Sequence, residues 1–271
     1  MTPHTASGGH AAPRSARGPI VTADDLGLRA DVDAGVVRAH REGIVTHASW
    51  LAGGETACEA AALVSRDAPG LGIGLHLALS QVRPSGPEGP LAALLTPEAR
   101  FPGQRRAFLW SLRRKRAVWR EWNAQADAFE RVWGRAPAHL DSHQHVHLAP
   151  WLGPLAVRLA VERGIPRLRA PHEGGAGVQA RAFSALGRRL AQTARAAGLE
   201  TPDAFRGFAV SGTLTLDDLR TWAGAGADGE EWMCHPGLRD EPDGYRRRQE
   251  LEALVAARGL WRGAGDPPEA P

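Results

Sequence analysis

The sequence contains few residues that cross-link a chain or hold it in a membrane. Its two cysteines, Cys58 and Cys234, belong to no Cys-x-x-Cys pair and are too few for a disulfide framework. This usage is typical of a reducing cytoplasm, which is where we expect the protein. No run of about 18 apolar residues occurs, so the sequence predicts no membrane span.

Lysine is nearly absent, since Lys115 is the only one. The 33 basic residues are therefore almost all arginine, and 30 acidic residues reduce the net charge to +3. One dense basic run, Arg105–Arg106 and Arg113–Arg116, overlaps a helical pattern and is interpreted as a solvated helix face. The composition thus gives no support for a nucleic-acid partner.

The length of 271 residues and the 43% hydrophobic fraction predict one large domain, which we place at residues 18–262. Residues 1–17 are rich in Ala, Gly, Ser and Pro and lack the apolar stretch of a signal peptide. We expect them to be a disordered extension, and residues 263–271 to be a disordered tail.

Short apolar runs alternate with helical patterns between these two ends, which predicts an α/β fold with a parallel sheet. A loop is predicted at 80–103, where Pro and Gly are frequent. The predicted strands are 19–23, 44–51, 71–77, 139–147, 166–170, 205–210 and 231–235. The predicted helices are 31–42, 55–66, 106–133, 150–164, 180–197, 215–223 and 245–258.

Polar residues follow several separate strands of this pattern: Asp24 and Asp25, then His76, then a histidine cluster, then His235. In a β/α barrel the carboxyl ends of all strands converge on one mouth. A doubly wound open sheet would place a site only at its switch point. The sequence therefore favours a TIM-like β/α barrel, and it leaves a seven-stranded or distorted version open.

Four of the eleven histidines lie in the nine residues 139–147. If this segment were extended throughout, alternation would place five polar side chains on one face: His139, Asp141, His143, His145 and His147. Leu140 and Val146 would face the core. A buried strand that ends in a metal site explains this pattern better than a fortuitous surface cluster does.

Histidine and carboxylate together hold zinc, cobalt, nickel or manganese, and they tolerate magnesium with several waters. Such a site, with a free carboxylate as base and a histidine as acid, predicts metal-assisted hydrolysis of an amide or ester. Alternatives are a helix cap or turn for Asp24–Asp25 and a core role for His76. Nucleophilic catalysis is less favoured, since Cys234 alternates away from His235 and Ser142 lacks a Gly-x-Ser-x-Gly elbow.

Five ordered motifs resemble the YdjC-like carbohydrate deacetylases, over about residues 19–260. They are Thr22–Gly27, Gly43–Thr46, Gly74–Leu77, His139–His147 and Met233–Pro236. The resemblance implies a β/α barrel of the glycoside hydrolase and deacetylase type, a divalent metal (Mg or Zn, or else Co, Ni or Mn) and removal of the N-acetyl group from an amino sugar. It also implies, weakly, a homodimer.

Matching the motifs residue by residue implies that Asp25, His76 and His143 are the metal ligands. Asp24 matches the catalytic base and His235 the general acid, and Arg169 would orient the base or bind substrate. Three further residues would then steer the orientation of the ligands: Asp141, His145 and His147.

Two positions depart from the family pattern, which usually has Phe where Leu26 stands and often Asn where Thr22 stands. Neither change removes a ligand or a proton donor. Loop 80–107 does not match the chitooligosaccharide enzymes, and segments 198–203 and 211–217 resemble a hopanoid-associated branch, which would imply a glycolipid substrate. The alternatives to an N-deacetylase are a hydrolase of another ester or amide and an inactive metal- or sugar-binding protein.

Overall fold

The computed structural model describes residues 18–174, 177–225, 228–242 and 244–260. Segments 1–17 and 263–271, for which we predict disorder, lie outside the described residues. Among the described helices, none is long and apolar enough to cross a membrane.

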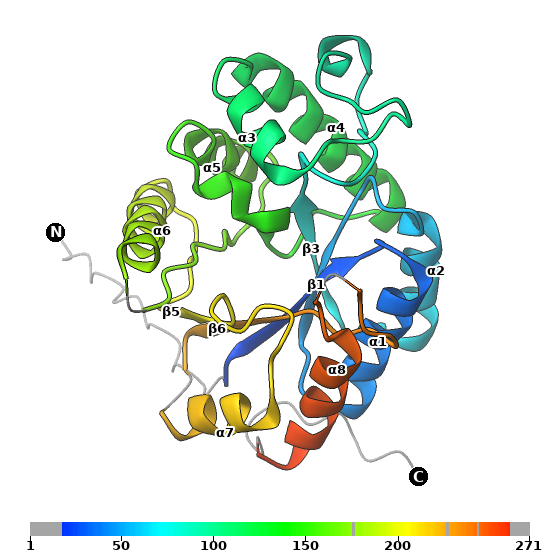
Figure 1. Cartoon of the computed structure of the whole chain (residues 1–271), viewed down its shortest axis with the longest axis vertical. Coiled ribbons are helices and arrows are strands. Elements are labelled where there is room, and N and C mark those ends of the chain that lie inside the picture. The colour runs from blue at the N-terminus through cyan, green and yellow to red at the C-terminus, as the bar shows by residue number, and fades with distance from the viewer. Residues whose placement is uncertain (1–17, 175–176, 226–227, 243, 261–271) are drawn as a thin grey trace, which may run out of the picture.

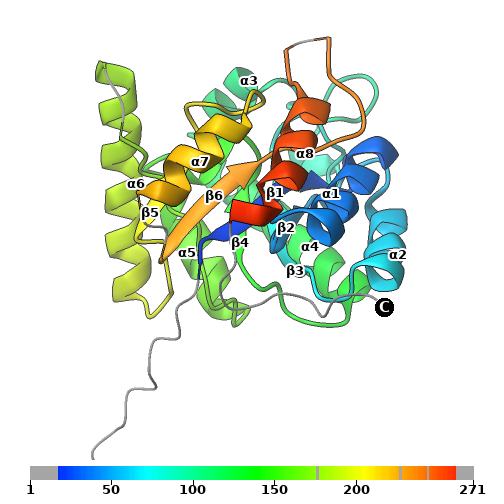
Figure 2. The same ribbon diagram turned by 90° about the horizontal axis from the view of Figure 1, so that it is seen from below.

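Six parallel strands form one sheet in the order β4-β3-β2-β1-β6-β5. The sheet curls into a half-barrel, with helices around its outside (Figures 1 and 2). This α/β architecture confirms the predicted fold class. The strands are β1 (Ile20–Leu26), β2 (His47–Trp50), β3 (Gly72–Leu77), β4 (Leu140–Ser142), β5 (Ala204–Arg206) and β6 (Glu230–Cys234).

At least one α-helix follows every strand, and two follow each of β3 and β4. The helices are α1 (Ala30–Glu42), α2 (Ala57–Asp67), α3 (Gln104–Ser111), α4 (Lys115–Trp133), α5 (Gly153–Glu162), α6 (Val178–Ala196), α7 (Leu216–Gly224) and α8 (Arg247–Ala256). Three short 3-10 helices are η1 (Gly89–Leu91), η2 (His143–Leu148) and η3 (Ala257–Leu260). The single helix predicted at 106–133 is in fact two, because the chain turns at residues 112–114.

The predicted strand 166–170 forms no ladder. It makes one isolated bridge to β4, Leu140↔Leu168, and another toward the start of β5, Arg167↔Glu200. Pro166 has no N–H to donate, and Pro171 ends the segment, so a longer ladder cannot form. Through these single-residue bridges, segment 166–170 spans the gap between the edge strand β4 and the residues before the edge strand β5. The result is a distorted barrel that is only partly closed.

The prediction that residues 139–147 form one extended strand is wrong after Ser142. Gln144 and His145 have φ angles of 54° and 52°, in the left-handed region, and the chain coils into η2. The alternation of side chains therefore stops, and the histidines do not share one face.

Large aromatic side chains fill the core between the sheet and the helices that cover it. Trp50, Trp122 and Trp232 are fully buried, and the Trp50 ring packs edge-on against Phe129 at 5.6 Å. Burying a side chain of this size stabilises a fold by about 1.5–3 kcal/mol. These tryptophans thus hold the strands in place and are not available to stack on a sugar.

A candidate metal and catalytic site at the strand ends

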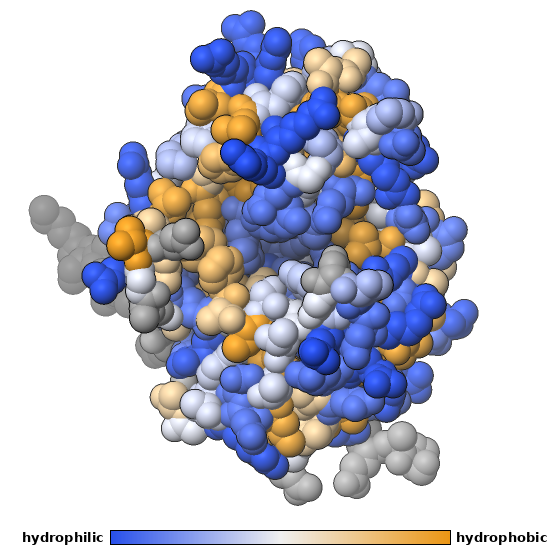
Figure 3. Space-filling view, in the orientation of Figure 1, coloured by the Kyte–Doolittle hydropathy of each residue, from blue (hydrophilic) through white to orange (hydrophobic). Residues whose placement is uncertain are grey.

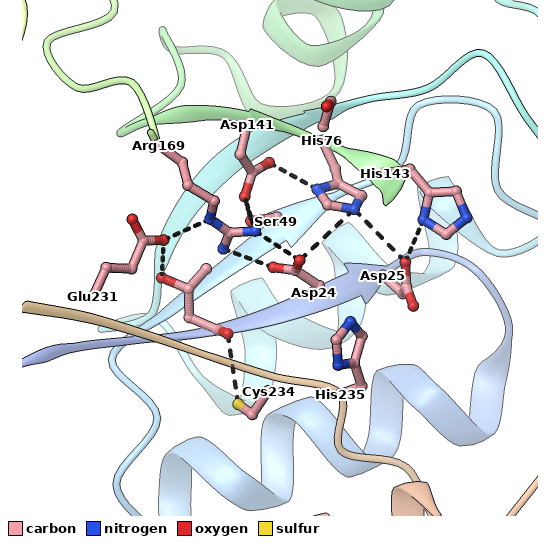
Figure 4. A network of polar contacts seen from close by, with 12 residues as sticks. Asp24, Asp25, Ser49, His76, Asp141, His143, Arg169, Glu231, Cys234 and His235 are labelled. Atoms are coloured by element: carbon pink, nitrogen blue, oxygen red, sulfur yellow. Dashed lines mark hydrogen bonds and ion pairs between the residues drawn. The ribbon is translucent and has the colours of Figure 1, made fainter. Parts of the chain in front are cut away.

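Two adjacent aspartates can serve one site because β1 is irregular at this point. The β1–β2 register shifts between Ala23 and Leu26, and Asp25 has φ 70°. In a regular strand Asp24 and Asp25 would point to opposite faces. The irregularity turns both buried carboxylates toward the end of the half-barrel (Figure 4).

Three side chains from β1, β3 and the start of η2 offer ligand atoms to one point. One atom each of Asp25, His76 and His143 lie within 4.8 Å of one another. His143 Nδ1 is 2.9 Å from Asp25 Oδ1, and His76 Nε2 is 3.7 Å from the same oxygen. This oxygen is buried and, apart from these two close imidazoles, has no hydrogen-bond partner among the described residues. Two imidazole nitrogens and one such oxygen are a donor set that fits a divalent metal.

The second Asp25 oxygen is fixed by α8, since Arg247 donates to it at 2.7 Å. Burial alone would raise the pKa of Asp25, but the neighbouring His143 and Arg247 hold it well below its ordinary value. The group is therefore an anion in the folded protein, as a metal ligand must be.

His76 is oriented by a buried aspartate on the neighbouring strand β4. Its Nδ1 lies 2.7 Å from Asp141 Oδ1. Asp141 Oδ2 accepts from Ser49 at 2.6 Å and pairs with Arg169 at 2.9 Å. Because a carboxylate can only accept, the proton of a neutral His76 is placed on Nδ1, and the Nε2 lone pair faces Asp24 and Asp25.

Asp24, His76 and Asp141 form a second group of potential ligands within 4.8 Å. Arg169 donates to both oxygens of Asp24, at 2.7 and 2.8 Å, and pairs with Asp141 as well. A cation would have to compete with this guanidinium. The group that contains Asp25 and His143 is therefore the better metal site.

The Asp24 carboxylate is held rigidly and is more basic than usual. Burial raises its pKa, and Arg169 opposes the rise only in part. Arg169 is itself fully buried and donates through Nε to Glu231 at 2.8 Å. Glu231 also accepts from Thr22 at 3.0 Å. The network fixes Asp24 beside Asp25 and His76 (Figure 4).

His235 follows β6, and its ring points toward the two carboxylates of β1 (Figure 4). The ring packs edge-on against Tyr245 at 5.1 Å, and its buried Nδ1 finds no hydrogen-bond partner in the described part of the chain. Burial lowers the pKa of His235 to about 3. Cys234 instead donates through Sγ to the Thr22 carbonyl at 3.5 Å.

The remaining histidines of 139–147 point elsewhere. The ring of His145 packs against three phenylalanine rings: Phe183, Phe205 and Phe208. His147 lies 2.9 Å from the Arg169 carbonyl, and His139 lies 2.9 Å from Ser49. Within this stretch only Asp141 and His143 therefore reach the site directly.

Several residues of the site carried no signal in the sequence. Gln81, in the loop after β3, is 2.8 Å from His143 Nε2 and fixes that ring from outside. Ser49, Glu231 and Arg247 reach the site from three other elements. The sequence predicts only the loop 80–103 that contains Gln81, and not the role of this side chain. The contacts depend on which strands become neighbours, so no local pattern predicts them.

A model of the YdjC-like protein family matches residues 20–258, which is nearly all of the described chain. The chain belongs to the YdjC-like family. This confirms the resemblance of its motifs. Two similar proteins are chitooligosaccharide deacetylases. The one from Enterobacter sp. (strain 638) is 33% identical over 247 residues, covering 88% of this chain and 90% of the relative. The one from Citrobacter koseri is 32% identical over 248 residues with the same coverage.

A crystal structure from Enterococcus faecalis V583, described as that of a cellobiose-phosphate cleavage protein, has a similar fold. It superposes with a TM-score of 0.69 at 26% identity, covering 89% of this chain and 91% of the other. In the YdjC-like chain described here, a hollow with a hydrophilic floor opens over the ends of β1 and β3 (Figure 3). The candidate site is thus open to a ligand from outside.

Proposed function

We propose that this protein is a metal-dependent N-deacetylase of acetylated amino sugars. The observation that carries the proposal is the group of Asp25, His76 and His143 beside a second buried carboxylate, Asp24, to which Arg169 donates. The names of the two curated relatives support a chitooligosaccharide as substrate. A glycolipid head group with the same acetamido sugar is the alternative that loop 80–107 leaves open.

Asp25, His76 and His143 would hold the metal, which supplies Lewis-acid polarisation of the amide oxygen and a more acidic water. The donor set of two imidazoles and one carboxylate favours zinc, cobalt or nickel over magnesium. Asp141 supports this role because it keeps the Nε2 lone pair of His76 directed at the site.

Asp24 would act as the general base. Its raised pKa favours taking a proton from the attacking water, and the two bonds from Arg169 keep the carboxylate in one orientation. His235, across the carboxylates, would donate a proton to the departing amine. Its pKa is low in the free protein, so negative charge developing on the substrate must raise it before it can carry that proton.

Acetate release from N-acetylglucosamine oligomers and from an acetylated glycolipid, measured with the protein loaded with zinc, cobalt, nickel or magnesium, tests the activity. No release from any of these substrates would refute the proposal. An ester panel separates it from another metal hydrolase. Substrate binding without turnover by the native chain would instead indicate an inactive binding protein.

Metal content after dialysis tests the roles of the residues. Asp25→Asn and His143→Ala should lose the metal, whereas Asp24→Asn should keep it and lose turnover. Asp127→Asn, on the exposed side of α4, is the matched control and should change neither property. Unchanged metal content in all of the variants would show that the metal lies elsewhere.

A further inference from the structure

The helix α3 and the residue that follows it expose large apolar side chains. Phe108, Leu109 and Leu112 are 38%, 60% and 47% exposed. Residues 108 and 112 are four apart and 109 is adjacent, so the three lie on one side of the helix. The opposite side is anchored, since Ala107 and Ser111 are buried and Ser111 Oγ accepts from Trp151 at 3.0 Å.

The same segment is strongly basic. Residues 104–120 carry seven positive charges and no acidic residue: Arg105, Arg106, Arg113, Arg114, Lys115, Arg116 and Arg120. All seven are exposed, and none forms an ion pair with a described residue. The net charge of the whole chain is only +3, so the residues outside this segment are net negative.

The nearest acidic residues along the chain do not neutralise this charge. Glu121 is buried and accepts from the backbone N–H groups of Ser85 and Gly86, at 2.8 and 2.9 Å. Glu98 lies on the preceding loop, close to Arg100. Three exposed apolar side chains thus lie on a segment whose cations form no ion pair with a described residue. Figure 3 shows hydrophobic and hydrophilic surface side by side over α3.

We propose that α3 and the turn after it, residues 104–116, dock the protein on an anionic lipid surface. Apolar side chains that enter the interface, with Arg and Lys beside them, are the pattern by which a helix lies on such a membrane. Each cation near the surface contributes about 1 kcal/mol of attraction. The proposal does not depend on the proposed enzymatic function.

Two other partners fit the segment less well. Binding of nucleic acid by its phosphates would use the cations but gives no reason for exposed Leu109 and Leu112. A second copy of the chain, meeting this face about a two-fold axis, would bring the six positive charges of residues 104–116 against the same six. An anionic membrane satisfies the apolar and the charged groups together.

The docking surface adjoins the candidate site. Gln104, the first residue of α3, donates through Nε2 to the Gln144 carbonyl at 3.0 Å, and Gln144 directly follows His143. A protein bound through α3 would therefore hold the opening of the site next to the lipid head groups, where it can meet substrates that stay in a membrane.

Co-sedimentation with phosphatidylcholine vesicles, with and without phosphatidylglycerol, tests the proposal on the full chain. Native protein should bind the mixed vesicles and not the neutral ones. Leu109→Gln/Leu112→Gln removes apolar insertion, and Arg113→Gln/Arg116→Gln removes two charges. Each pair should weaken binding by about tenfold or more. Both should keep the native melting temperature and the native rate on a water-soluble substrate.

Two control pairs match these variants. Arg131→Gln/Arg135→Gln removes the same charge in the last turn of α4 and just after it, at the far end of a helix about 28 Å long. Val161→Gln/Val178→Gln removes exposed apolar groups outside the segment. Both should bind like the native protein. Equal binding to neutral vesicles, an equal loss in the controls, or no loss in the α3 pairs would overturn the proposal.

RNA binding and gel filtration distinguish the other partners. Tight RNA binding that Leu109→Gln/Leu112→Gln leaves intact, with no vesicle binding, would indicate a nucleic-acid surface. A native dimer that this pair converts to a monomer, again without vesicle binding, would indicate a self-association face. Either result would refute the membrane proposal.

Discussion

Asp141 is expected to control how tightly the site binds a divalent metal, although it is not one of the three proposed ligands. It is fully buried and accepts from His76 at 2.7 Å and from Ser49 at 2.6 Å. In Asp141→Asn an NH₂ group, which can only donate hydrogen bonds, replaces one carboxylate oxygen. That amide must face either the N–H of His76 or the donors of Ser49 and Arg169.

The magnitude follows from the bond that is lost. A hydrogen bond to a charged group contributes about 1.5–3 kcal/mol, which corresponds to about a 10- to 100-fold change in an equilibrium constant. This agrees with the 10- to 100-fold loss of metal affinity usual for groups that orient a ligating histidine. Competition titration against a coloured chelator measures the dissociation constant directly and requires no activity.

Ser49→Ala is the graded comparison for Asp141→Asn. It removes one neutral donor and keeps the charge of Asp141 and its bond to His76, so its effect should be smaller than that of Asp141→Asn. Asp127→Asn serves as the surface control. An Asp141→Asn protein that melts like the native chain and binds zinc as tightly would refute the assignment of His76 as a ligand held by this carboxylate.

Three more outcomes are expected. Burial raises the pKa of Glu250 to about 7, so its stabilising effect is complete below its ordinary pKa of 4.5 and is lost as the pH rises through 7. Gln cannot ionise, so in Glu250→Gln the free energy of unfolding, measured in urea from pH 4.5 to 8, should fall by up to about 3 kcal/mol less than in the native chain. An unchanged dependence on pH would contradict the shift. Gly74→Ala should cost about 1–3 kcal/mol in the same assay, because a Cβ there overlaps the buried ring of His139; native stability would show that this ring can move. When the free metal is at 100 times its dissociation constant, binding stabilises the fold by about 2.7 kcal/mol, and chelation should lower the melting temperature by the corresponding amount. An equal shift in His143→Ala would place that metal elsewhere.

Much of the proposed site could be predicted because its parts are local. Asp24, Asp25 and His76 each follow an apolar run that must be a strand, and parallel strands bring their carboxyl ends to one edge. The structure brings Asp25, His76 and His143 together as the motifs implied. What failed was the extension of one pattern through residues 139–147, since alternation in the sequence does not reveal that Gln144 and His145 adopt positive φ angles.

The sequence by itself determined the alternation of strands and helices, the family and the residues that meet at the strand ends, because these follow from local spacing and short motifs. Only the tertiary structure decided that Arg169 joins Asp24, Asp141 and Glu231, and that Arg247 fixes Asp25 from α8. These pairs lie far apart in the chain and depend on which strands become neighbours and on how far the sheet curls. The basic run and Phe108, Leu109 and Leu112 are interleaved in the sequence, but only the fold leaves these three apolar side chains exposed.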